Sequence, residues 1–136
     1  MYFVNHHVKR MTYIAFWETS VANRLSGRSD RAGFRQRKTG WAVRLETIDA
    51  ATWKAEVALV AAAHERLVAA VAGFDPARLD RPAGKRTVRP AVEYIHGVAE
   101  HTLYHTAQLK LIARLARARG VADDDGRSSS RSTSRR

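Results

Sequence analysis

The stretch YIHGVAEHTLYHTAQLKLIARL, residues 94–115, carries the clearest structural pattern in the chain. Steps of three and four residues along it connect one row of side chains: Tyr94, Val98, His101, His105, Gln108, Ile112 and Leu115. Such a row lies on one face of an α-helix, because side chains three and four positions apart are neighbours there. Pro90 in the first turn and Gly120 after the last one predict a helix that runs to about Arg119.

Two further segments show the same helical spacing. The first, residues 2–25, has an apolar stripe, and Gly27 follows it as a helix stop. The second, TWKAEVALVAAAHERLVAAVAGF at residues 52–74, is preceded by two candidate capping residues, Thr47 and Asp49, and is ended by Gly73 and Pro76. We expect one broad core face on this second helix, made of Trp53, Val57, Val60, Ala61, His64, Leu67, Val68 and Val71.

No segment has the alternating pattern of a β-strand, so the sequence predicts an all-α fold of helical-bundle type with three long helices. The basic, glycine-containing residues 28–50 predict a long loop. We expect residues 1–120 to form the helical domain and residues 121–136, rich in Ser and Arg, to be a disordered tail. Each helix has an apolar face wide enough for two neighbours, so we expect a fourth helix to be missing from this chain or supplied by a partner subunit.

Composition narrows the class of protein. The 136 residues contain no cysteine, so any metal ligands must come from His, Asp or Glu. No apolar run has the length of a membrane helix or of a signal peptide, and we expect a cytoplasmic protein without a membrane partner. The net charge of +11 comes mainly from dispersed arginine, and no basic motif interleaved with aromatic residues accompanies it. We therefore expect no specific nucleic-acid binding.

His101 and His105 are the candidate metal ligands. An i, i+4 pair projects two imidazoles from one helical face, the spacing that lets them share an ion. A lone histidine on an apolar face is more often a hydrogen-bonded core residue, and an HxxxH spacing also arises by chance. Gln108 adds another polar residue to the row, one turn after His105. There it either holds a ligand in place or has only a packing role.

A third ligand is expected near the N-terminus, from His6 or His7. His7 falls on the stripe with Val4, Met11, Ile14, Val21 and Leu25, whereas His6 falls with Arg10, Tyr13, Trp17, Ser20 and Arg24, a face we expect to be peripheral. His7 is therefore the preferred ligand. Glu18, on the His7 side of the helix, is expected at most to face a substrate or to support a ligand. His64 and His96 are expected to be structural.

The segment from Gly97 to Leu111 resembles the last helix of the DinB-like superfamily of metal-dependent hydrolases. The matching residues are Gly97, His101, Tyr104, His105, Gln108 and Leu111, with Ala107 at a usual glycine position. The stretches VNHHVKRMTYIAFWETSVANRLSG, residues 4–27, and 52–74 resemble the second and third helices of that family. The resemblance implies an up-and-down four-helix bundle whose first helix is absent here, frequent homodimerisation, and a metal on three histidines, His7, His101 and His105.

For function, the resemblance implies a divalent metal, zinc or nickel, with iron or manganese as alternatives. It also implies a small thiol or amide substrate that is hydrolysed or to which a low-molecular-weight thiol is transferred. No nucleophile or general base can be identified in the sequence. The alternative is a non-catalytic helical module that dimerises or binds a partner through the groove left by the missing helix.

Overall fold

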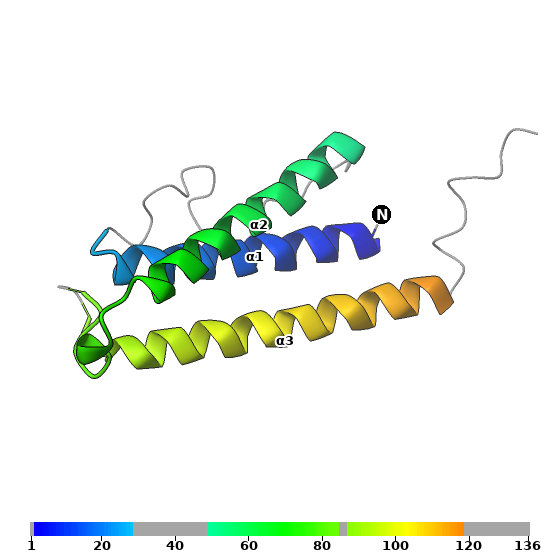
Figure 1. The fold of residues 1–136 in the computed structure, drawn as a ribbon. Helices are drawn as coiled ribbons and strands as arrows, with labels where there is room; N and C mark the ends of the chain where they lie inside the picture. The colour runs from blue at the N-terminus through cyan, green and yellow to red at the C-terminus, as the bar shows by residue number, and fades with distance from the viewer. Residues whose placement is uncertain (1, 29–48, 85–86, 119–136) are drawn as a thin grey trace, which may run out of the picture.

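The computed structural model describes residues 2–28, 49–84 and 87–118, and for residues 2–6 it describes the backbone alone. Three long helices dominate it: α1 (Tyr2–Leu25), α2 (Ala50–Ala72) and α3 (Ala91–Ala118), with a short 3₁₀ helix, η1 (Pro76–Arg78), between the last two (Figure 1). The described residues contain no β-strand. The predicted all-α class is confirmed, and so are the three predicted helices.

The helix ends follow from local chemistry. The carboxylate of Asp49 accepts a hydrogen bond from the Thr52 backbone N–H at 2.7 Å, which caps the start of α2. Gly73 is the C-cap residue of that helix, and its backbone N–H makes the last helical bond, to the Ala69 carbonyl. Gly27 follows α1 with φ +70°, a left-handed conformation that costs glycine little. Pro90 directly precedes α3, which is why the chain turns into a helix there.

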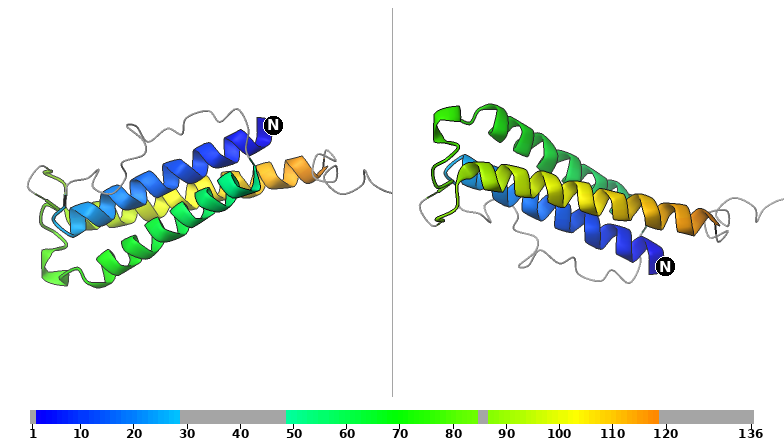
Figure 2. Two further views of the ribbon diagram at one scale, coloured as in Figure 1. Left: turned by 90° about the horizontal axis from the view of Figure 1, so that it is seen from above. Right: turned by 90° about the horizontal axis from the view of Figure 1, so that it is seen from below.

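The directions of the helices differ from those of a simple up-and-down bundle, in which successive helices run antiparallel. Helices α1 and α2 run in the same direction, and α3 runs opposite to both (Figures 1 and 2). A parallel pair cannot be joined by a short turn, and residues 26–49 separate α1 from α2 in the sequence. Of the loop expected in 28–50, residues 29–48 lie outside the described residues, and Ala50 already belongs to α2. The tail 121–136 also lies outside them, and nothing tests the expectation that a fourth helix is missing or supplied by a partner.

Helix α1 is the central element, because it packs against both α2 and α3. Its buried side chains therefore lie on more than one face and include polar groups: Val8, Met11, Thr12, Ile14, Ala15, Glu18, Thr19, Ser20, Val21, Ala22, Asn23 and Leu25. Ala15 on α1 and Ala63 on α2 are both fully buried in one cluster, and small side chains at that point let the helices approach closely. Near the other end, Leu25, Leu67 and Val98 bring all three helices into one hydrophobic core.

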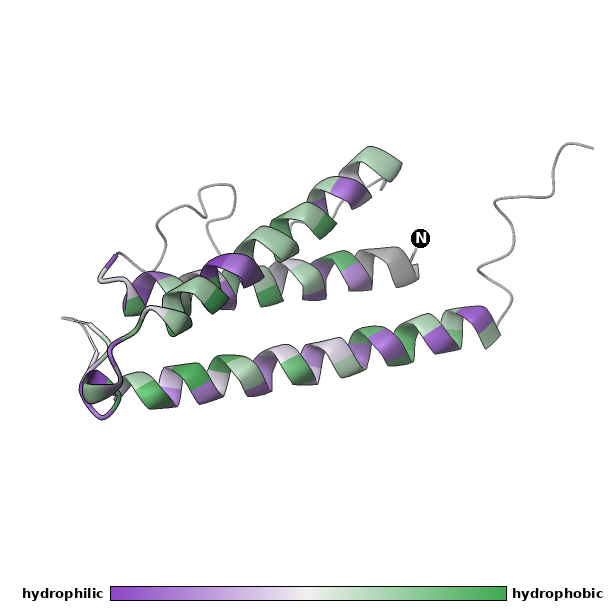
Figure 3. Cartoon of the chain, viewed as in Figure 1, coloured by the Kyte–Doolittle hydropathy of each residue, from purple (hydrophilic) through white to green (hydrophobic). Residues whose placement is uncertain are grey.

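The core face of α2 differs from the predicted one. The buried residues of α2 are Glu56, Ala63 and Leu67, while the predicted core residues Trp53, Val57 and Val68 are 40%, 44% and 53% exposed. The reason is that α2 packs mainly on α1, so much of its broad apolar face remains uncovered. Figure 3 shows hydrophobic residues along the length of both α2 and α3.

Candidate metal centre

The histidine pair His101 and His105 lies on the side of α3 that faces α1. The two imidazole rings are 4.5 Å apart between centroids and nearly perpendicular. Tyr13 of α1 contacts both, with centroid distances of 5.0 Å to His101 and 5.4 Å to His105. Trp17, one turn further along α1, lies 5.9 Å from His101. The pair is therefore held against two aromatic rings between the helices.

A chain of hydrogen bonds orients His105. Arg10 donates from Nε to the side-chain oxygen of Gln108 at 2.8 Å, and Nδ1 of His105 lies 2.9 Å from the same oxygen. Because an arginine N–H can only donate, the shared atom must be the amide oxygen, and Nδ1 must carry the proton that it shares. The lone pair of the His105 ring is then on Nε2, the nitrogen that remains for a ligand bond.

His101 has no comparable partner. Both of its ring nitrogens are buried and without a hydrogen bond in the described structure. Burial lowers the pKa of His101, and the nearby His105 lowers it further, since a second positive charge would be repelled. His101 is accordingly held in its neutral form, the form in which an imidazole binds a metal.

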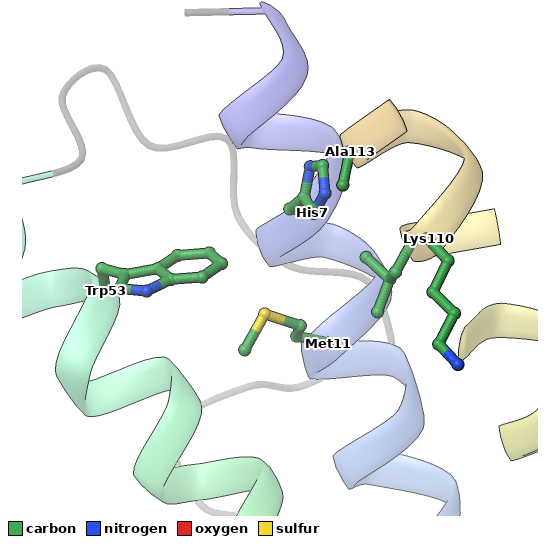
Figure 4. Close-up of a pocket in the computed structure, with 6 residues that line it drawn as sticks. His7, Met11, Trp53, Lys110 and Ala113 are labelled. Atoms are coloured by element: carbon green, nitrogen blue, oxygen red, sulfur yellow. The ribbon is translucent and has the colours of Figure 1, made fainter. Parts of the chain in front are cut away.

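His7 lies in a different environment. It lines a pocket of about 560 Å³ together with Met11, Trp53, Leu109, Lys110 and Ala113, between the N-terminal part of α1 and the ends of α2 and α3 (Figure 4). Among the side chains that the structure describes, no three of the types His, Cys, Asp or Glu are grouped so as to hold a metal ion. The structure thus brings His101 and His105 together but does not bring His7 to them.

The helical face of α1 that was expected to be peripheral is the one that packs on α3. Arg10 bonds to Gln108, Tyr13 contacts both members of the histidine pair, and Arg24 donates to the hydroxyl of Tyr94 at 3.4 Å. That expectation was wrong because the face carries charged and aromatic residues, which serve here as interhelical contacts. Position 6 of the backbone lies four residues before Arg10, in the register of this face.

Glu18 has a larger role than the sequence indicated. It is 1% exposed, and its Oε1 accepts a hydrogen bond from the Thr102 hydroxyl at 3.0 Å and lies 3.2 Å from Nδ1 of His64. Its Oε2 has no hydrogen-bond partner. The one available signal was its position four residues after Ile14 on the apolar stripe. His96 is exposed on α3.

No protein-family model, no curated protein and no solved structure matches this chain. Across the described helices, none is both long enough and apolar enough to cross a membrane.

Proposed function

We propose that the protein binds a divalent metal ion, zinc or nickel, through His101, His105 and one histidine from the N-terminal turns of α1. The observation that carries the proposal is that both ring nitrogens of His101 are buried without a partner beside a second imidazole. Burying such groups costs free energy unless something satisfies them, and a metal bond would satisfy one of the two nitrogens. Imidazole ligands suit zinc and nickel, so the residues present fit the ion.

The third ligand of the proposed site is His6 or His7. The register of α1 favours His6, because Arg10 and Tyr13, which follow it on the same face, contact the α3 residues around the histidine pair. His7 remains the alternative that the resemblance to DinB-like proteins implied. Separate His6→Ala and His7→Ala variants distinguish the two.

The proposed activity is hydrolysis of a small amide, or transfer of a low-molecular-weight thiol, as the resemblance implies. A bound divalent ion supplies a Lewis acid that activates water or stabilises a thiolate. Around it, the chain's own residues have distinct tasks. Gln108 and Arg10 hold the His105 ring with Nε2 free, and Tyr13 and Trp17 offer ring surfaces beside His101 for the apolar part of a substrate.

Elemental analysis of purified protein tests the metal proposal. We expect about one equivalent of zinc or nickel in the native chain and a loss of it in a His101→Ala, His105→Ala double variant. His96→Ala is the matched control, since it removes an exposed histidine from the same helix. Equal metal content in the double variant and the control would overturn the proposal.

A second candidate, a non-catalytic module that forms homodimers, rests on exposed apolar residues of α3. Tyr104, Leu111 and Leu115 follow one another at steps of seven and four and are 61%, 58% and 44% exposed. An uncovered stripe of this kind often marks a protein contact. Light scattering on the native chain and on a Leu111→Glu variant tests this candidate: we expect a dimer that the variant dissociates. A monomeric native chain would contradict it.

A further inference from the structure

A second cavity, whose lining does not include the histidine pair, lies between α2 and α3 and is also lined by Glu18 of α1. It has a volume of about 610 Å³, within the range of small-molecule sites. Its wall is mostly aliphatic and includes Val68 and Val71 of α2 and Ile95 and Leu103 of α3. We call this cavity the Glu18 pocket, after the carboxylate that also lines it.

The carboxylate of Glu18 is only half satisfied. Its Oε1 interacts with the Thr102 hydroxyl and with His64, whereas its Oε2 is buried and has no partner. The nearest arginine on α2, Arg66, directs its guanidinium to the hydroxyl of Thr19 at 3.1 Å. A carboxylate oxygen at an apolar wall needs a donor, and a cationic one forms the strongest hydrogen bond.

From these observations we infer that the Glu18 pocket binds a small primary alkylammonium ion. The ammonium group pairs with the carboxylate of Glu18, which lines the pocket, and the alkyl chain lies against the aliphatic wall. Thr102 and His64 hold Oε1 and so fix the orientation of the carboxylate. His64 lies at the solvent side of the pocket, because its side chain is 59% exposed. The inference does not depend on the metal proposal.

The test is a calorimetric titration of the full chain with n-hexylamine, compared with two ligands of the same length, n-hexanol and hexanoate. We expect hexylamine to bind at least tenfold more tightly than either. Glu18→Gln keeps the shape and the acceptor oxygen of the side chain but removes its charge, so hexylamine affinity should fall at least tenfold while hexanol affinity is unchanged.

Because Glu18 is buried, a folding defect in Glu18→Gln would also reduce hexylamine binding. A second variant therefore tests the pocket at an exposed position. Ala99 lines the pocket but is exposed, so Ala99→Leu fills the space without altering the core. We expect it to abolish hexylamine binding, whereas the His101→Ala, His105→Ala variant should bind as the native chain does. Equal binding of the three ligands, or unchanged hexylamine binding in Glu18→Gln and Ala99→Leu, would overturn the inference. The inference would also be overturned if the native chain formed a dimer that excludes hexylamine and that Ala99→Leu dissociates.

Discussion

Replacing Gln108 with alanine should both weaken the fold and loosen the metal site. The amide oxygen of Gln108 is the point where Arg10 of α1 and His105 of α3 meet, at 2.8 and 2.9 Å. Without it, the α1–α3 contact loses its link through Arg10, and the ring of His105 loses the acceptor that fixes its proton on Nδ1.

The size of the effect follows from these two bonds. A hydrogen bond to a charged group contributes about 1.5 to 3 kcal/mol and a neutral one about 0.5 to 1.5 kcal/mol. Both bonds of Gln108 are only partly buried, so we take the lower ends, about 2 kcal/mol together. In a domain of this size that corresponds to a fall in Tm of roughly 8 °C. Loss of a residue that orients a metal-bound histidine typically lowers metal affinity about 10- to 100-fold.

Urea unfolding of the chelator-treated protein measures the first quantity, and competition with a chromophoric chelator measures the second. Gln108→Glu is the matched control, since it keeps an acceptor between Arg10 and His105 and should preserve stability. If Gln108→Ala changed the free energy of unfolding by less than about 0.5 kcal/mol, the lower end for one neutral bond, the assigned hydrogen-bond chain would be refuted.

Three further predictions concern the helices around the site. The pKa of His101 is lower in the folded protein than the ordinary histidine value of 6.5. As the pH falls through 6.5, His101 therefore takes up a proton in the unfolded chain before it does so in the folded one. Stability of the metal-free protein should therefore drop below that pH, and His101→Phe should flatten the drop in urea titrations; an unchanged slope would contradict the burial. Ala63→Leu should cost about 1 to 3 kcal/mol by overpacking the α1–α2 contact, measured by thermal melting, and a neutral effect would mean that the helices are not close there. Thr12→Val should cost about 1 to 3 kcal/mol by removing a hydroxyl that lies 3.0 Å from the buried Glu56; a stabilising effect would argue against that contact.

The helices themselves were predictable, because the positions of their ends depend on nearby residues. Asp49, Gly73, Gly27 and Pro90 act on backbone groups within a few residues, and such effects can be derived from sequence alone. The pairing of His101 with His105 was predictable for the same reason, since it depends only on the pitch of one helix.

The choice of faces was not predictable, because it depends on which helices become neighbours. Helix α1 is central and buries polar residues such as Glu18, so its apolar stripe does not identify the side that meets α3. The contacting face instead carries Arg10, Tyr13 and Trp17, whose partners lie 84 to 98 residues away in sequence. On α2 the apolar face is wider than the one helix that covers it, so Trp53 stays exposed.

X-ray absorption spectroscopy of the zinc-loaded chain is the most direct test of the proposed histidine site, because it reports the atoms bound to the ion. For a site of three histidines we expect a shell of nitrogen neighbours at about 2.0 to 2.1 Å with the scattering of three imidazole rings. Replacing His101 should remove one of those rings from the spectrum. A shell made only of oxygen ligands, or one that is unaltered in the His101→Ala, His105→Ala variant, would contradict the claim that this histidine pair holds the metal.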